Sequence, residues 1–221
     1  NIRELERPTP GPGQVLVKVA FSGICGSELS GIMGQNSLRQ PPLVFGHELA
    51  GIVAELGEGV TTTRPGARVT VNPLISCGRC GYCISGNHQR CRERLLLGAS
   101  LPGSNAEFVL VPSTALEDVP DGLDLKDAAM AEPAACAVHA VSLSQITAES
   151  SALVVGAGPI GLFVTQVLRA HGVSRVFASD RNPERRRMAA DLGAIALRDG
   201  DEELLADVRE LTGGAGVEVA F

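Results

Sequence analysis

Short segments in the first half of the chain alternate apolar and polar residues, which is the period of a strand with one buried face. Residues 14–20, 51–57, 67–71 and 106–112 follow this pattern. Glycines and prolines separate the segments, as they do in turns between strands. Short strands at this spacing predict a small barrel-like β domain in this part of the chain.

From residue 124 onward the pattern changes to helices that alternate with strands. Residues 124–144 are alanine-rich and helical in pattern, and residues 151–155 are an apolar run typical of a buried strand. The elements predicted next are a helix to about residue 171, a strand at 175–180, helices at 185–192 and 202–211, and a strand from 216. Alternating strands and helices indicate βαβ units in a parallel sheet. Such a sheet normally has two βαβαβ halves and only the first is present, so we expect the natural protein to continue beyond Phe221.

Composition and charge argue against two classes of protein. The chain has 221 residues, of which 44% are hydrophobic and 20% charged, a mixture that can bury a core. Its net charge of −6 and its lack of a basic stripe argue against a nucleic-acid surface. No apolar stretch reaches the roughly 18 residues of a membrane span. Six cysteines, most of them in settings that suit metals, fit a reducing compartment, so we expect a cytoplasmic protein.

Four cysteines lie within one short segment, at the spacing C-x2-C-x2-C-x7-C. Cysteines three residues apart in a loop rarely meet disulfide geometry in two compatible pairs. Four thiolates this close together suit a closed, tetrahedral structural zinc site. The alternatives are an accidental cysteine-rich loop and redox thiols. The predicted ligands of this structural zinc are Cys77, Cys80, Cys83 and Cys91.

A glycine-rich loop, Gly156-Ala-Gly-Pro-Ile-Gly161, follows a predicted strand and opens a predicted helix. In that setting the G-x-G-x-x-G pattern predicts binding of a dinucleotide pyrophosphate. Gly156 allows the tight turn, Gly158 lets backbone amides approach the phosphates, and Gly161 lets the helix pack on the strand. The helix N-terminus adds positive potential. The alternative is a glycine-rich turn that binds no nucleotide.

Charged residues at the end of the next strand bear on the choice of coenzyme. Asp180 stands where a carboxylate accepts hydrogen bonds from the adenosine ribose and repels a 2′-phosphate. Arg181 and Arg185 could instead hold that phosphate, but the carboxylate favours NAD over NADP. We therefore predict a Rossmann dinucleotide-binding domain over residues 141–221, preceded by a zinc-binding domain over residues 1–140.

Further segments carry side chains of the kinds that bind metals, namely Cys25, His47 with Glu48, and Glu132. Each is a weak signal by itself. A lone buried cysteine is usually a small apolar residue, and a lone histidine is usually a satisfied core residue. Together with the cysteine loop and the nucleotide fold, they form one pattern.

The chain resembles the zinc-dependent medium-chain dehydrogenase/reductase family, and within it the polyol (sorbitol-like) and threonine dehydrogenase branch. The resemblance covers essentially all 221 residues, with the motifs in the order and at the spacing of the family. It implies an α/β protein with a GroES-like β-barrel catalytic domain and a Rossmann domain. The motifs are Pro10-Gly-Pro-Gly13, Gly23-Ile-Cys-Gly-Ser27, Gly46-His-Glu48, the four-cysteine loop, Glu132-Pro133, Val138-His-Ala140 and Val155-Gly-Ala-Gly-Pro-Ile-Gly161.

By this resemblance Cys25 and His47 bind a catalytic zinc. Glu132 takes the third-ligand position, which is Cys in the alcohol dehydrogenase branch and Glu in the polyol branch. Glu48 lies beside the metal, as a ligand or as an exchange partner for a water. Ser27 matches the hydroxyl that relays the alcohol proton. A mixed sulfur, nitrogen and oxygen set leaves an open position on the metal, which a catalytic zinc requires.

The glycine motif contains Pro159 and Ile160, and Ile160 matches the side chain packed behind the nicotinamide. Two residues depart from the family pattern. Glu28 stands where the family usually has an Asp that orients the metal-bound histidine. Ser30 stands where it often has a His at the outer end of the proton relay, so a proton would need water or the cofactor ribose to leave.

These features predict a zinc-dependent oxidoreductase that transfers hydride between a secondary alcohol and NAD, with two zinc ions per chain. The alcohol would belong to a polyol, a sugar or a hydroxy-amino acid. The partners would be this small alcohol or its ketone, and copies of the chain in a homodimer or homotetramer. The alternatives are an NADP-preferring ketone reductase, a zinc-free quinone or enoyl reductase of the same superfamily, and a non-catalytic zinc- or NAD-binding protein. The intact ligand set argues against the last two.

Overall fold

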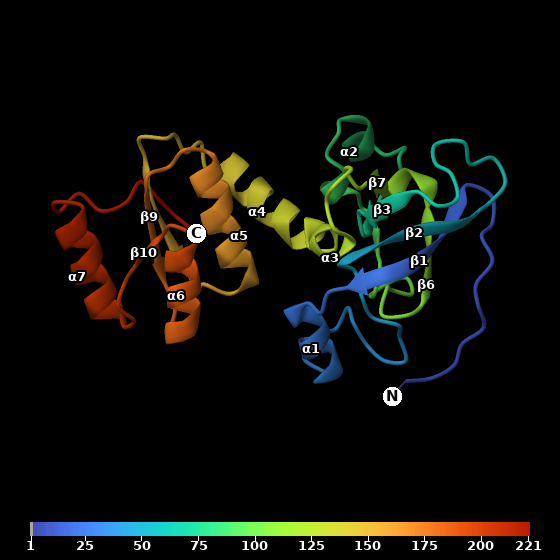
Figure 1. Cartoon of the computed structure of the whole chain (residues 1–221), viewed down its shortest axis with the longest axis horizontal. Helices are drawn as coiled ribbons and strands as arrows, with labels where there is room; N and C mark the ends of the chain where they lie inside the picture. Colours follow the sequence, from blue (N-terminus) through green and yellow to red (C-terminus); the bar gives the residue numbers. More distant parts are fainter. Residues whose placement is uncertain (1) are drawn as a thin grey trace. The chain divides into compact units, whose positions relative to one another are not determined.

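The computed structural model describes residues 2–221, which divide into two compact units. The first unit ends at Glu132, and the second covers Pro133–Phe221. The predicted border at residues 140 and 141 falls inside helix α4 (Ala131–Leu143), most of which belongs to the second unit (Figure 1). None of the helices in the described part of the chain is long and apolar enough to cross a membrane.

The first unit is built on a five-stranded antiparallel sheet in the order β6-β1-β2-β3-β7. The predicted strands at 14–20, 51–57, 67–71 and 106–112 are confirmed as β1, β2, β3 and β6. The strands are β1 (Gln14–Ser22), β2 (Leu49–Leu56), β3 (Arg68–Val71), β6 (Phe108–Pro112) and β7 (Leu116–Asp118), with a short 3-10 helix η2 (Ser113–Ala115) before the last.

Strand β1 is more deeply buried than a strand with one apolar face. Val15, Leu16 and Val17 are all fully buried, although they point alternately to opposite faces. Val15 and Val17 belong to the main core of the sheet. On the other side, the short helix α3 (Leu125–Ala128) packs against β1 and β2. A central strand covered on both faces explains the unbroken apolar run.

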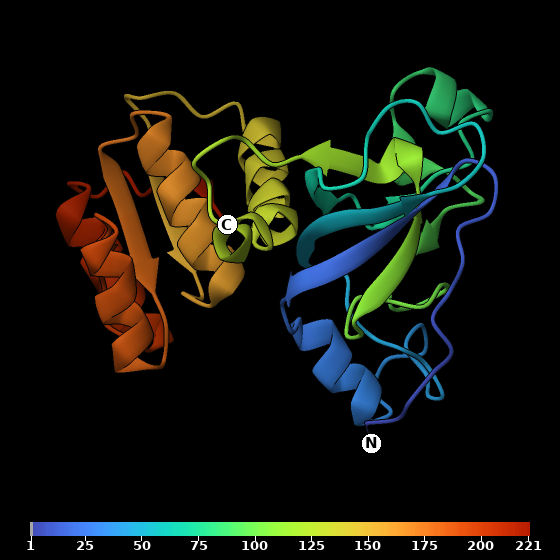
Figure 2. The ribbon, with the colours of Figure 1, turned by 45° about the vertical axis from the view of Figure 1, so that its right-hand side comes forward.

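Two small substructures carry the candidate metal ligands. Helix α1 (Gly26–Ile32) directly follows β1, as Figure 2 shows. The cysteine segment lies between the paired strands β4 (Leu74–Ile75) and β5 (Leu95–Leu96). It contains only the single turn α2 (Gly81–Ile84) and the 3-10 turn η1 (His88–Arg90). With so little regular structure, this segment needs another source of stability.

The second unit is a parallel sheet in the order β10-β9-β8-β11, as the alternating pattern predicts. Its main core lies between the sheet and the helices, and includes Val154, Leu168 and Ala178. The elements are β8 (Ser151–Val155), α5 (Pro159–Ala170), β9 (Arg175–Ser179), α6 (Pro183–Asp191), β10 (Ile195–Ala196), α7 (Asp201–Leu211) and β11 (Val219–Ala220).

The alanine-rich segment 124–144 is two helices rather than one continuous helix, because α3 ends at Ala128 and α4 begins at Ala131. Pro133 accounts for the break. Proline has no N–H to donate, and its ring clashes with a helical carbonyl four residues earlier, here that of Ala129. Proline is tolerated in the first turn of a helix, which is where α4 places it.

Candidate metal centres and dinucleotide site

The structure brings together the four cysteines of the predicted structural site. All four sulfurs lie within 4.8 Å of one another, and Cys83 and Cys91 are buried. Cys80 and Cys83 are separated by 3.5 Å between sulfurs, and Cys77 and Cys83 by 3.9 Å. Zn–S bonds of about 2.3 Å in a tetrahedron put the sulfurs about 3.8 Å apart, so the spacing fits zinc. It is far longer than the roughly 2.05 Å of a disulfide bond.

Two of these thiols, Cys77 and Cys83, have pKa values shifted in opposite directions. The backbone N–H of Arg79, followed by that of Cys80, donates to Cys77 and lowers the pKa of its thiol to about 6. Burial instead raises the pKa of the Cys83 thiol to about 11. The backbone donors thus favour the thiolate of Cys77, whereas burial disfavours that of Cys83.

A second cluster contains three of the four ligands predicted for the catalytic metal. Atoms of Cys25, His47 and Glu48 lie within 4.8 Å of one another. Cys25 immediately precedes α1, and the histidine and glutamate immediately precede β2, so the sheet joins segments far apart in sequence. Glu132 lies half-buried in the first turn of α4 and is outside this cluster. Its place as a ligand stays a prediction.

Glu28 fixes the orientation of His47. Its Oε1 lies 2.8 Å from His47 Nδ1, and both side chains are almost fully buried. Because a carboxylate only accepts, Nδ1 carries the hydrogen and Nε2 presents its lone pair to a metal. Glu28 also accepts from the N–H of Gly46 at 3.1 Å and from Nδ2 of Asn105 at 3.2 Å. Glu28 therefore reaches the histidine, although its side chain is one methylene longer than the Asp that the family pattern leads us to expect here.

Glycines allow the chain segments of this cluster to approach one another. A Cβ on Gly23 would lie 2.3 Å from Glu48 Oε2, and one on Gly46 would lie 2.4 Å from the backbone nitrogen of Asn105. Gly46 also has a φ of +106°, a conformation that residues with a side chain rarely adopt. These two positions exclude larger residues, and so the carboxylate and the histidine can lie close together.

Ser27 occupies the second position of α1, and three side chains hold it. Its Oγ accepts from Arg39 Nε at 3.1 Å. Its carbonyl accepts from Ser30 Oγ at 2.9 Å and from Asn36 Nδ2 at 3.3 Å. Ser30 therefore donates to backbone and does not continue a relay from the Ser27 hydroxyl. Arg39 was missed in the sequence because it lies in an irregular loop, with no motif around it.

The glycine loop has the geometry that a dinucleotide requires. A Cβ on Gly161 would lie 1.9 Å from the carbonyl oxygen of Gly156, so α5 packs closely on β8 only because glycine is present. A Cβ on Gly158 would meet nothing within 4 Å, which leaves space for a ligand to approach. Gly158 caps α5, Pro159 begins it, and Ile160 in its first turn is half exposed. Proline suits the first position of a helix because the N–H that it lacks would have no hydrogen-bond partner within the helix.

Asp180 is held as an anion at the end of β9. Its carboxylate accepts from the N–H of Asn182 at 2.8 Å and from the N–H of Ala157 at 2.9 Å. Together with the nearby Arg185, whose Nη1 lies 3.7 Å from it, these donors lower the pKa of Asp180, the Asn182 N–H most strongly. A pocket of about 370 Å³ lies here within the second unit, and Arg181 also lines it.

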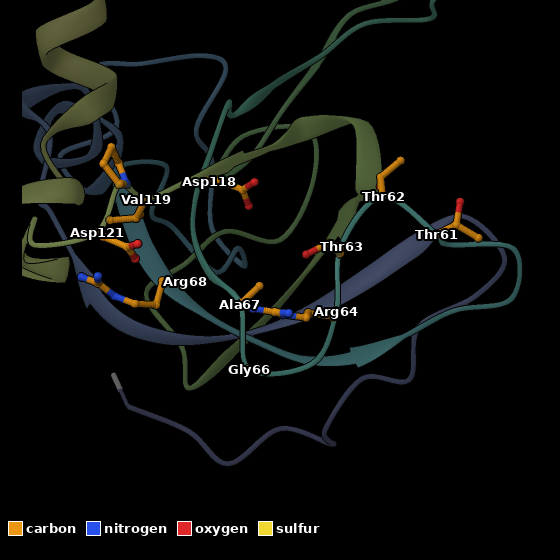
Figure 3. A pocket seen from close by; sticks show the side chains of 11 residues that line it. Thr61, Thr62, Thr63, Arg64, Gly66, Ala67, Arg68, Asp118, Val119 and Asp121 are labelled. Carbon is orange, nitrogen blue, oxygen red and sulfur yellow. The ribbon is translucent and has the colours of Figure 1, made fainter.

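A larger and more open pocket of about 740 Å³ lies on the first unit between the loop before β3 and the end of β7 (Figure 3). Thr61, Thr62 and Thr63 line it together with Arg64 and Asp118. No residue predicted to bind metal or cofactor is among its lining residues. This pocket is therefore separate from the sites that the sequence predicts.

Each of the two units contains a segment that matches a known protein family. The alcohol dehydrogenase GroES-like domain matches residues 11–121, and the zinc-binding dehydrogenase domain matches residues 159–221. The chain belongs to the zinc-dependent medium-chain dehydrogenase family. The predicted fold class, a GroES-like domain followed by a Rossmann domain, is thereby confirmed.

Members of this family are similar to essentially the whole chain. The sorbitol dehydrogenase of Halalkalibacterium halodurans is 38% identical over 223 residues, which cover 100% of the chain and 65% of that protein. The structure of the alcohol dehydrogenase rspB from Escherichia coli CFT073 with NADH is 37% identical, with a TM-score of 0.90, over 96% of this chain and 63% of that one.

A third family member was solved with the other coenzyme. A zinc-binding dehydrogenase from Sinorhizobium meliloti 1021 bound to NADP is 40% identical, with a TM-score of 0.87, over 97% of this chain and 62% of that one. The chain thus spans 62–65% of the length of these three dehydrogenases. Both nicotinamide coenzymes are therefore found bound to proteins similar to this chain.

Proposed function

We propose that the full-length protein is a zinc- and NAD-dependent dehydrogenase of secondary alcohols. The observation that carries the proposal is the cluster of Cys25, His47 and Glu48, in which Glu28 leaves His47 Nε2 able to bind a metal. Metal-free reductases of the same fold need no such cluster. The reaction also needs a coenzyme, and the glycine loop of the second unit would bind it.

Each side chain has a defined part in this reaction. Cys25, His47 and Glu48 hold zinc, with Glu132 as a further ligand, while Cys77, Cys80, Cys83 and Cys91 hold a second, structural zinc. Bound zinc would supply a Lewis acid for the alcohol oxygen, and NAD would supply the hydride acceptor. Ser27 Oγ takes the proton that the alcohol loses. The amides of the glycine loop orient the coenzyme, and Ile160 supports its nicotinamide ring.

The decisive experiment measures metal content together with turnover of the full-length protein. We expect two zinc ions per chain, and NAD reduction with one or more members of a panel of polyols, sugars and threonine. A mild chelator should remove one zinc together with the activity, because a site with an open position exchanges its metal more readily than a closed one. One tightly held zinc and no turnover would contradict the proposal.

Coenzyme preference depends on Asp180. Its ionised carboxylate, with the pKa lowered by two backbone N–H donors, would accept hydrogen bonds from the adenosine ribose and repel a 2′-phosphate. Asp180→Ala should lower kcat/KM for NAD by roughly 10–100-fold, the value of a hydrogen bond to a charged group. It should leave kcat/KM for NADP unchanged or raise it, because the repulsion of the 2′-phosphate is removed while Arg181 and Arg185 remain. An equal loss with both coenzymes would contradict this role.

The substrate class and the assembly belong to the same proposal. A polyol, sugar or hydroxy-amino acid is supported by the similarity to a sorbitol dehydrogenase. The protein would be a cytoplasmic homodimer or homotetramer. Light scattering on the full-length protein would test the assembly, and a monomer would contradict that part alone.

A further inference from the structure

We propose that Arg39 is a positioning residue, which holds the Ser27 hydroxyl and stabilises the negative charge that Ser27 Oγ acquires when its own hydrogen leaves for water or the cofactor ribose, before Oγ takes the alcohol proton. The proposal rests on the proposed function, in which Ser27 handles the alcohol proton. Arg39 is only 4% exposed, although it carries a permanent charge. Burying a charge is costly unless its donors are used, so the contacts of the guanidinium define its role.

The guanidinium directs each of its three nitrogens at a different part of the site. Its Nε donates to Ser27 Oγ at 3.1 Å, and Nη1 donates to the carbonyl of Gly98 at 3.3 Å. Its Nη2 lies 3.4 Å from His47 Nδ1. The Nδ1 hydrogen already points to Glu28, at the shorter distance of 2.8 Å, so this last contact places charge beside the histidine without donating to it. Arg39 thus joins the predicted proton carrier to the metal cluster.

The hydrogen bond from Arg39 determines what Ser27 can still do. A hydroxyl has one donor and two acceptor positions, and Arg39 occupies one acceptor. The remaining acceptor position is left for the alcohol proton, and the hydroxyl hydrogen for the water or cofactor ribose that carries a proton away. A fixed cation next to an oxygen that gains negative charge is preorganised electrostatic stabilisation, which needs no rearrangement during the reaction. A neutral amide could hold the loop equally well, but it could not supply that charge.

The backbone around Arg39 is built to hold this geometry. A Cβ on Gly31 would lie 2.8 Å from both the Cβ and the carbonyl oxygen of Arg39, so the loop lies against α1 only because residue 31 is glycine. Gly98 has a φ of +66° and packs against the backbone of Gly46. Gly31 and Gly98, which both contact Arg39, are therefore positions that exclude a side chain.

A double-mutant cycle on the full-length protein tests the proposal. Ser27→Ala should lower kcat by roughly 100-fold, the scale of general acid–base catalysis. Arg39→Met should lower kcat by roughly 10–50-fold, with two zinc ions per chain retained. In the Ser27→Ala background, Arg39→Met should lower kcat by less than about threefold, because residues that act through one another are not additive.

Two further variants separate positioning from general loss of structure. Arg39→Lys keeps the charge but loses the planar fork, so it should recover part of the kcat that Arg39→Met loses. Added guanidinium chloride at low millimolar concentration should also raise the kcat of Arg39→Met. The control is Arg7→Met, which removes an exposed arginine paired with Glu55 at 2.7 Å and should leave kcat unchanged.

Three outcomes would overturn the proposal. They are a normal kcat in Arg39→Met, a full 10–50-fold loss of kcat from Arg39→Met in the Ser27→Ala background, and no recovery with either lysine or guanidinium. A wild-type protein without turnover would contradict the proposed function instead. Crystal structures of wild type and Arg39→Met then decide the positioning role: we expect Ser27 Oγ to leave its place in the variant, and an unchanged Ser27 would overturn it.

Discussion

The two candidate metal centres of the first unit are built in opposite ways. The cysteine site takes all its ligands from residues 77–91, in a segment with almost no regular structure. The mixed cluster takes Cys25 from the turn between β1 and α1, and His47 and Glu48 from the segment that leads into β2. A closed site can thus be encoded in one loop, whereas an open one is assembled by the tertiary fold.

The two sites also differ in the hydrogen-bonding groups that support their predicted ligands. In the cysteine site, backbone N–H groups of neighbouring residues support the sulfurs, as those of Arg79 and Cys80 do for Cys77. In the mixed cluster, the supporting group is the buried side chain of Glu28, which also binds Asn105 far along the chain. We therefore expect damage to the first site to appear as lost stability, and damage to the second as lost activity.

The largest expected effect follows from removing a ligand of the cysteine site. Cys91→Ser replaces a fully buried sulfur and should release the structural zinc. Because a segment without regular structure depends on its metal for folding, Tm should fall by roughly 10 °C or more. Metal analysis and differential scanning calorimetry measure the two effects. A variant with one zinc fewer and an unchanged Tm would show that the loop does not stabilise the fold.

Removing a ligand of the mixed cluster should have the opposite outcome. Cys25→Ser should lower kcat by about 1,000-fold or more, since the metal polarises the reacting oxygen. Its Tm should stay within about 3 °C of wild type, because the β sheet holds the surrounding segments independently of the metal. Initial-rate kinetics and calorimetry on the same sample provide the test. A fall in Tm as large as that of Cys91→Ser would remove the distinction between the two sites.

An intermediate effect, on zinc affinity, is expected from changing Glu28, which accepts the hydrogen bond of His47. Glu28→Gln keeps the size of the side chain but removes its charge and one acceptor, so His47 becomes a weaker and less well oriented ligand. Zinc affinity of the catalytic site should fall by roughly 10–100-fold, while the cysteine site keeps its metal. Competition with a chromophoric chelator measures both affinities. Unchanged affinity of the catalytic site would show that Glu28 contributes to packing alone.

The smallest effect concerns chemistry inside the cysteine loop. With the pKa of Cys77 lowered to about 6 and that of Cys83 raised to about 11, only the first is a thiolate at pH 7 in metal-free protein. Iodoacetamide should therefore alkylate Cys77 at least about 10-fold faster than Cys83, and the rate at Cys77 should fall by about 10-fold between pH 7 and pH 5 as its thiolate takes up a proton. Peptide mass spectrometry measures both rates. Equal rates at pH 7 would contradict the role of the backbone donors.

The pattern of apolar residues predicted the elements well where local sequence controls them. The strands that were predicted lie within a few residues of their expected positions, and the glycine loop lies between β8 and α5 as expected, but the short strands β7 and β10 were not predicted. The helical pattern at 124–144 is confirmed as two helices, and periodicity alone did not locate the break between them, because it does not weigh the effect of Pro133 on the preceding turn. The burial of Leu16 was also missed, since its covering helix α3 comes from residues more than a hundred positions later.

The sequence by itself determined the cysteine site, the glycine loop and the order of the elements, because each depends on residues that are neighbours along the chain. Only the tertiary structure decided how the mixed cluster is held. The hydrogen bond from His47 to Glu28, the approach of Arg39 to Ser27 and the close contact at Gly31 join segments that no local pattern relates. The physical reason is that a buried charge selects its partners by distance and geometry after the sheet has formed, and not by its position in the sequence.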